Sequence, residues 1–251
     1  MKKTMAVLAG VVCMGMCAAQ AELTAQWKFD GSLVNAAGAK FELKPSGWSE
    51  PVYLDDARSG GRSICFGNPP AGGPKTATDR LGLSDTADLG IGSGSWSFSA
   101  WIKPSEDVLS GAMTIFSVEG SDTKWKLYCD IREKNSMNVF FRNDSSSVSE
   151  KVAAGFWAHP GNWSLLVVVF DSTAGTVSVY RYSDETSPKN IKSEGLVLRK
   201  QLNNKFDLTV KSFALGYNLA NAGSGFKGLM DDVRIYNHAL SEQEIAKLIE
   251  K

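Results

Sequence analysis

Three oxygen-bearing side chains near the two ends of the chain could hold a metal ion. Strand-like alternation over 229–235 places Asp231 on the same side as three aliphatic residues. A carboxylate buried there needs a cation, an arginine or several N–H donors. Asp30, just before a glycine turn, could add a second carboxylate, and Asn35 a carbonyl oxygen, as calcium prefers. The residues allow a calcium site. They also allow Asp231 to pair with an arginine or backbone donors while Asp30 merely caps a turn.

A second set of side chains is of the kind that binds sugars. A sugar stacks one ring face on Trp or Tyr, while amides and carboxylates bind its hydroxyl groups. The candidates in polar or glycine-rich, loop-like stretches are Trp48, Trp125, Trp157, Tyr217 and Asn218. The alternative is that each tryptophan packs against a sheet edge. The other tryptophans lie in strand-like runs and are expected in the core: Trp27, Trp96, Trp101 and Trp163.

The first 21 residues have the pattern of a cleaved secretory signal. A basic start precedes an apolar run over 5–17, and small residues follow at 19 and 21. We therefore expect residues 1–21 to be removed and residues 22–251 to form one exported domain. The 27 Lys+Arg are balanced by 27 Asp+Glu, which gives no electrostatic case for nucleic acid or an anionic membrane as partner.

Two cysteines remain outside this segment, Cys65 and Cys129, both in strand-like runs. In an oxidising compartment they could form one disulfide bond. Closing so long a loop would contribute about 4 kcal/mol in the chain-entropy model. The alternative is two buried, unpaired thiols that pack as small hydrophobic groups.

The elements expected to position these side chains are short β-strands. Residues 23–29 and 96–103 alternate apolar with polar or small residues, as half-buried strands do. Residues 165–170 are continuously apolar, which favours a strand buried on both faces. The only convincing helix is terminal, where Ser241 and Glu244 have the spacing of a capping box. Further strands are expected at 112–118, 124–131, 137–142, 175–182, 207–216 and 226–237. The pattern predicts an all-β, two-sheet antiparallel jelly roll with a short C-terminal helix.

Four segments carry a family resemblance: residues 27–31, 96–104, 163–171 and above all 228–241. Together they resemble the LamG-like jelly-roll family of the concanavalin A-like lectin/glucanase superfamily. The stretch from about 183 to 205 departs from that pattern and suggests a longer polar loop. The resemblance implies secreted modules that bind carbohydrate or protein and frequently bind calcium. It also implies that Asp30 and Asp231 match positions that often serve a calcium site between the first and last strands.

The superfamily includes glucanases, so catalysis must be considered. Retaining hydrolysis needs two carboxylates about 5 Å apart, carried in these enzymes on a Glu-x-Asp-x-x-Glu strand. The nearest sequence here runs from Tyr128 to Glu133, with tyrosine at the first acidic position. The two histidines lie in no zinc motif. The sequence favours a secreted, non-catalytic module that binds glycan around a structural calcium ion. The alternatives are a protein–protein or surface-assembly module of the same fold and a divergent glycoside hydrolase.

Overall fold

The computed structural model describes residues 22–46, 50–67, 80–83, 85–105, 111–121, 124–146, 148–156, 160–183, 195–220 and 224–250. The predicted signal segment 1–21, Trp48 and Trp157 lie outside these residues. Within the described part of the chain, no helix has the length and apolar character needed to cross a bilayer.

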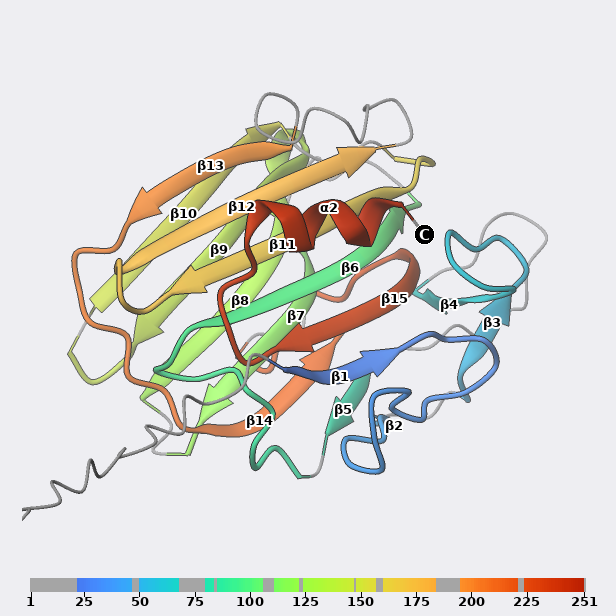
Figure 1. Ribbon diagram of the computed structural model, residues 1–251, viewed down its shortest axis with the longest axis horizontal. Helices are drawn as coiled ribbons and strands as arrows, with labels where there is room; N and C mark the ends of the chain where they lie inside the picture. Colours follow the sequence, from blue (N-terminus) through green and yellow to red (C-terminus); the bar gives the residue numbers. More distant parts are fainter. Residues whose placement is uncertain are drawn as a thin grey trace, which may run out of the picture.

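Two antiparallel sheets are stacked face to face (Figure 1). Sheet A contains β1 (Leu23–Trp27), β3 (Val52–Leu54), β4 (Ser63–Phe66), β6 (Trp96–Pro104), β11 (Ser164–Asp171), β12 (Thr176–Ser183), β13 (Leu196–Gln201) and β15 (Gly228–Tyr236). Sheet B contains β2 (Lys44–Pro45), β5 (Leu81–Leu83), β7 (Ala112–Gly120), β8 (Trp125–Arg132), β9 (Ser136–Asn143), β10 (Val148–Phe156) and β14 (Val210–Leu215). The order is β13-β12-β11-β6-β15-β4-β3 in sheet A, with β1 also paired to β15, and β10-β9-β8-β7-β14-β5-β2 in sheet B. This confirms the predicted jelly-roll sandwich, including the pairing of the first strand with the last.

The main core lies between the sheets because alternate residues of each strand point inward. From β6 it receives Trp96, Phe98 and Ile102, as the alternation predicts. Phe98 stacks on Phe116 of β7 with ring centroids 4.2 Å apart, so the two sheets meet directly at this pair. The opposite residues of sheet A do not face water: a second apolar cluster includes Trp101 and Trp163. Sheet A is therefore buried on both faces, as its continuously apolar strand β11 indicates.

Helix α2 (Glu242–Ile249) covers this second cluster from the outside (Figure 1). Ser241 and Glu244 form the predicted capping box, in which each side chain accepts a hydrogen bond from the other residue's backbone N–H. Ile245 and Leu248 are the buried residues of the helix. So short a helix is marginal by itself, and its apolar face holds it on the sheet.

The last strand departs from regular alternation. A bulge between Asp231 and Arg234 shifts its register against β6, and Asp232 adopts a left-handed φ of 44°. Val233 consequently faces the core between the sheets, whereas Leu229 belongs to the outer cluster. The prediction that Asp231 shares one face with Val233 and Ile235 is wrong, because the bulge changes the face halfway along the strand.

Two further predictions are corrected. Residues 196–201 form β13 within the stretch expected to be a polar loop, and it pairs with β12. Cys65 and Cys129 are free thiols, so the predicted disulfide bond is wrong. Cys65 belongs to the outer cluster of sheet A and Cys129 to the core between the sheets. The backbone of sheet A therefore separates the two sulfur atoms.

Candidate functional site

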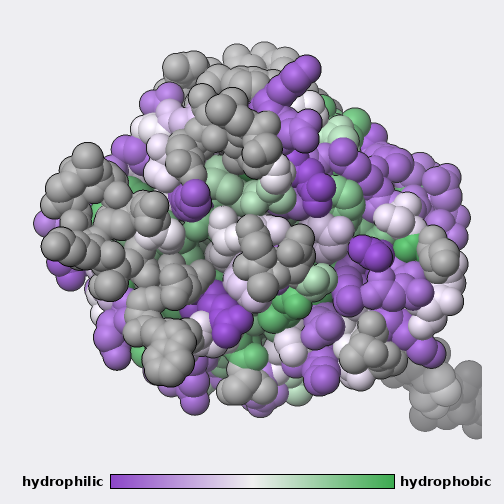
Figure 2. Space-filling view, turned by 180° about the vertical axis from the view of Figure 1, so that it is seen from behind, coloured by the Kyte–Doolittle hydropathy of each residue, from purple (hydrophilic) through white to green (hydrophobic). Residues whose placement is uncertain are grey.

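The outer face of sheet B carries the side chains that do not enter the core. Because β8 and β9 pair in register, Tyr128 lies opposite Phe140, Asp130 opposite Asn138, and Lys126 opposite Arg142. The alternate residues of the same strands, such as Leu127, point into the core. Figure 2 shows this side of the molecule, where polar and apolar surface is mixed.

A hollow of about 340 Å³ lies on this face and is the candidate ligand site. The described residues that line it come from β7, β8, β9 and the segment after β14: Gly111, Ala112, Tyr128, Arg132, Arg142, Asn218, Ala220 and Ser224. The lining offers two guanidinium groups, a phenol, an amide and a hydroxyl. These groups can donate hydrogen bonds to the hydroxyl groups of a polyhydroxylated ligand and accept hydrogen bonds from them.

Acidic residues outside the lining hold the two arginines of the hollow. Asp130 is fully buried and receives hydrogen bonds from Arg132 Nε at 3.1 and 3.0 Å. Burial raises the pKa of Asp130, while Arg132 opposes that rise. Arg142 Nε contacts Asp144 at 2.8 Å, and Lys126 binds the same carboxylate at 2.6 Å. Arg142 also hydrogen-bonds the Tyr128 hydroxyl. The N–H groups that are not used in these contacts remain for a ligand.

The segment that carries Asn218 is attached to β7. The Ser117 hydroxyl donates to the Tyr217 carbonyl at 2.7 Å and accepts from Leu219 N–H at 3.1 Å. Asn218 Oδ1 accepts from Ala220 N–H at 2.8 Å, which forms a tight turn at the rim. Asn218 lines the hollow, and its role as a ligand residue stays a prediction. The ring of the half-buried Tyr217 lies under the Arg80 guanidinium at 4.7 Å.

Trp125 is not in an exposed loop. It begins β8, and its half-buried ring meets Phe206 edge-on at 5.2 Å on the core side of the sheet. Among the described residues, Val34 is the exposed large hydrophobic side chain, and it is not aromatic. The described residues thus supply no exposed tryptophan platform for a sugar ring.

Sequence reasoning did not single out Arg132 and Arg142 as ligand residues. The signal was present in the alternation of 125–132 and 136–143, which places their polar residues on one face of the sheet. The alternation does not show which segment packs beside this face. The segment around Asn218 is brought there by β14, which is distant in the sequence.

The predicted calcium residues lie on the other sheet, around the loop 55–62. Asp231 Oδ2 accepts from Arg58 N–H at 2.8 Å and Ser59 N–H at 2.6 Å. Asp30 Oδ1 accepts from Gly61 N–H at 2.7 Å and Arg62 N–H at 3.1 Å. The loop is thus fastened by both carboxylates, and the backbone-donor alternative accounts for these two oxygens.

Asn35 has a separate role. Its Oδ1 accepts from Gln26 N–H at 2.7 Å and Ala37 N–H at 3.0 Å, which closes the loop after β1. An oxygen facing two N–H groups is not oriented toward a cation. Asp231 Oδ1, by contrast, is buried and accepts no hydrogen bond from the described part of the loop, so it is the buried oxygen here that fits a metal ligand. Burial raises the pKa of Asp231 to about 6, against the hydrogen bonds from Ser59 and Arg58.

The described residues contain no group of three or more His, Cys, Asp or Glu side chains close enough to hold a metal ion. Asp30 and Asp231 would have to be completed by backbone carbonyls or water, which calcium accepts. Calcium at this place remains a prediction.

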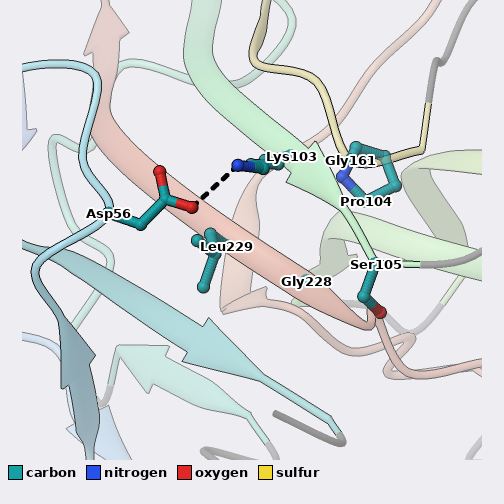
Figure 3. Close-up of a pocket in the computed structure, with 7 residues that line it drawn as sticks. All are labelled: Asp56, Lys103, Pro104, Ser105, Gly161, Gly228 and Leu229. Atoms are coloured by element: carbon teal, nitrogen blue, oxygen red, sulfur yellow. Dashed lines mark hydrogen bonds and ion pairs between the residues drawn. The ribbon is translucent and has the colours of Figure 1, made fainter. Parts of the chain in front are cut away.

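A second hollow, of about 440 Å³, lies beside this loop (Figure 3). Lys103 and Asp56 point toward one another across it, with Nζ and Oδ2 2.7 Å apart, above Leu229. Trp163 Nε1 also donates to Asp56 at 2.9 Å. Burial alone would raise the pKa of Asp56, but the bonds from Lys103 and Trp163 lower it below its ordinary value. The charged groups of this hollow are paired with each other, so it offers less to a ligand than the hollow on sheet B.

A family model described as "Concanavalin A-like lectin/glucanases superfamily" (Laminin_G_3) matches residues 75–246. The chain belongs to this family. Among curated proteins, no sequence match was found.

Solved structures share the Laminin_G_3 fold at low sequence identity. Domain 4 of AbnA, a GH43 extracellular arabinanase from Geobacillus stearothermophilus in complex with arabinotriose, has a TM-score of 0.64 and 22% identity, covering 91% of this chain and 98% of that one. The binding domain of botulinum neurotoxin serotype G has a TM-score of 0.64 and 13% identity, covering 91% and 51%. The CBM40 of a Ruminococcus gnavus IT-sialidase, bound to α2,3-sialyllactose, has a TM-score of 0.52 and 12% identity, covering 65% and 85%.

Proposed function

We propose that this protein is an exported, non-catalytic module that binds carbohydrate in the hollow on the outer face of sheet B. The observation that carries the proposal is the convergence of Tyr128, Arg132, Arg142 and Asn218 on one hollow. Their donors and acceptors suit the hydroxyl groups of a sugar. Two structures of the same fold hold arabinotriose and sialyllactose, which supports a glycan as the class of ligand.

The lining of the hollow also supports a binding role over hydrolysis. No carboxylate is among its described lining residues, whereas glycoside hydrolysis uses a pair of them flanking the scissile bond. Asp130, the nearest acid on β8, is fully buried and bound to Arg132. We therefore assign Asp130 to the support of Arg132.

We also propose that the protein binds a structural calcium ion. Asp231 and Asp30 would hold it, at the buried Oδ1 of Asp231. Bound there, the ion would compensate a buried charge and fix the loop 55–62 between β15, which carries Asp231, and the turn after β1, which carries Asp30.

A glycan array followed by calorimetry tests the binding proposal. The array should carry neutral and acidic glycans of plant, microbial and mucin type. The best ligand is then titrated into the wild type, Tyr128→Phe and Arg142→Gln, with Lys247→Gln on the exposed side of α2 as a control that also removes one positive charge. We expect both hollow variants to bind more weakly and the control to bind as the wild type does.

If the protein bound no glycan of the array, the proposal would be overturned and a protein partner would be favoured. Binding that both hollow variants leave unchanged would place the sugar elsewhere.

A further inference from the structure

We infer that the hollow on sheet B selects glycans that carry a carboxylate group, and that Arg132 and Arg142 bind that group. This inference rests on the proposed function, because it assumes that a glycan occupies the hollow. The inference goes beyond the proposed function by naming the chemical class of the ligand.

The first support is the charge of the lining. Two guanidinium groups and no carboxylate line the hollow among the described residues. Two further cations stand on the same face, since Lys126 lies opposite Arg142 and Lys151 lies opposite Phe140. Three acidic side chains in or beside the described strands share this face: Asp130 is buried against Arg132, Asp144 bridges Lys126 and Arg142, and Glu119 lies opposite Lys126. None of the three lines the hollow.

The second support is the geometry of the arginines. Asp130 holds Arg132 by Nε and Nη2, and Asp144 holds Arg142 by Nε. A guanidinium held in this way keeps further N–H groups in a fixed plane, and such a fork matches the two oxygens of a carboxylate. The Arg142 side chain is 54% exposed and that of Arg132 is 38% exposed, so both can be reached from solvent.

The third support is the absence of a free aromatic platform in the described part of the face. Phe140 stacks on Tyr128 with centroids 4.7 Å apart, and the Arg132 guanidinium lies over its ring at 4.6 Å. Lys151 Nζ also lies 5.8 Å from this ring. A neutral sugar gains much of its affinity by stacking on an open ring, and here cations occupy that place. What the hollow offers instead is charge-assisted hydrogen bonding, which favours an acidic sugar.

Matched probes test the inference. Trigalacturonate is compared with its methyl ester, which keeps the ring and hydroxyl groups but loses the charge. α2,3-Sialyllactose is compared with lactose, so that the two arms separate a hexuronic acid from a sialic acid. Affinities are measured by calorimetry for the wild type, Arg142→Gln, Arg142→Lys and the control Lys247→Gln, and melting temperatures verify that each variant is folded.

We expect one acidic probe to bind at least about tenfold more tightly than its neutral partner, since hydrogen bonds to charged groups are worth that much or more. Arg142→Gln should remove the preference, and Arg142→Lys should restore only part of it, because a lysine lacks the planar fork. Lys247→Gln should keep it.

Equal affinity for acidic and neutral partners would overturn the inference and leave the proposed function standing. The inference would also be overturned, and the proposed function would stand, if the protein bound neutral glycans of the array but neither acidic probe. Failure to bind any glycan would overturn both.

Discussion

Asp30 and Asp231, from opposite ends of the chain, accept hydrogen bonds from adjacent stretches of one loop. Asp231 binds the N–H groups of Arg58 and Ser59, and Asp30 binds those of Gly61 and Arg62. The loop also reaches sheet A through Arg58, whose guanidinium lies over the Trp101 ring at 4.4 Å. The two acids thus hold the loop 55–62 beside β15, at the point where its pairing with β4 ends and its pairing with β1 begins.

Asp231 should make stability depend on pH in a characteristic direction. Its pKa of about 6 in the fold lies above the ordinary value of 3.8. The folded state therefore binds the proton more tightly than the unfolded state does. The stabilisation of the fold by this proton is fully present below about pH 4 and is lost as the pH rises through about 6. Without metal, the unfolding free energy of the wild type minus that of Asp231→Asn should fall by about 2–3 kcal/mol between about pH 4 and pH 7.

Urea unfolding of both proteins in EDTA, at a series of pH values, measures this difference. A difference that stays constant, or that grows with pH, would contradict a raised pKa at Asp231.

Calcium should act through the same carboxylate. If the ion binds at Asp231 Oδ1, calcium should raise the melting temperature of the wild type, because the unfolded chain cannot assemble the ligands. Asp231→Asn should abolish the shift, and Lys247→Gln should retain it. If neither calcium nor EDTA changed the melting temperature of the wild type, the proposed calcium site would be contradicted.

The C-terminal helix should depend on its cap. Ser241→Ala removes the side chain that accepts from Glu244 N–H, and we expect a loss of about 1 kcal/mol. Leu248→Ala, which uncovers the outer cluster of sheet A, should cost about 2–4 kcal/mol. The exposed Gln243→Ala on the same helix is the control. Chemical denaturation compares the three, and equal stability of all of them would show that α2 contributes little to the fold.

The two thiols should be unreactive in the folded protein. Burial raises the pKa of Cys65 to about 11 and that of Cys129 well above its ordinary value. Only the thiolate reacts readily with alkylating agents. Iodoacetamide should therefore modify neither residue before unfolding and both after it, without a reductant. Peptide mapping by mass spectrometry reads this out, and a linked Cys65–Cys129 peptide would refute the free-thiol arrangement.

Local patterns were enough to predict much of the architecture. The alternation over 96–103 predicts which side of β6 enters the core, because β6 itself runs without a bulge and pairs with β11 in continuous register. The capping box at Ser241 needs only residues a few positions apart. These features depend on neighbours in sequence, so the sequence shows them.

The remaining features depend on partners distant in the chain. The bulge at Asp232 carries a left-handed residue that Gln26 Nε2 and Arg234 hold in place at 2.7 and 3.0 Å. Nothing in the sequence around Asp232 signals it, and it moves Val233 to the opposite face. The hollow likewise needs β8, β9 and the segment at Asn218 together, and that juxtaposition is set by sheet order.

A calorimetric titration tests whether the hollow on sheet B is the glycan site. The glycan with the strongest array signal is titrated calorimetrically into the wild type, Arg142→Gln and Lys247→Gln. We expect Arg142→Gln to weaken binding by at least about tenfold and Lys247→Gln to leave it unchanged. Equal dissociation constants for all three proteins would contradict the assignment of the glycan site to this hollow.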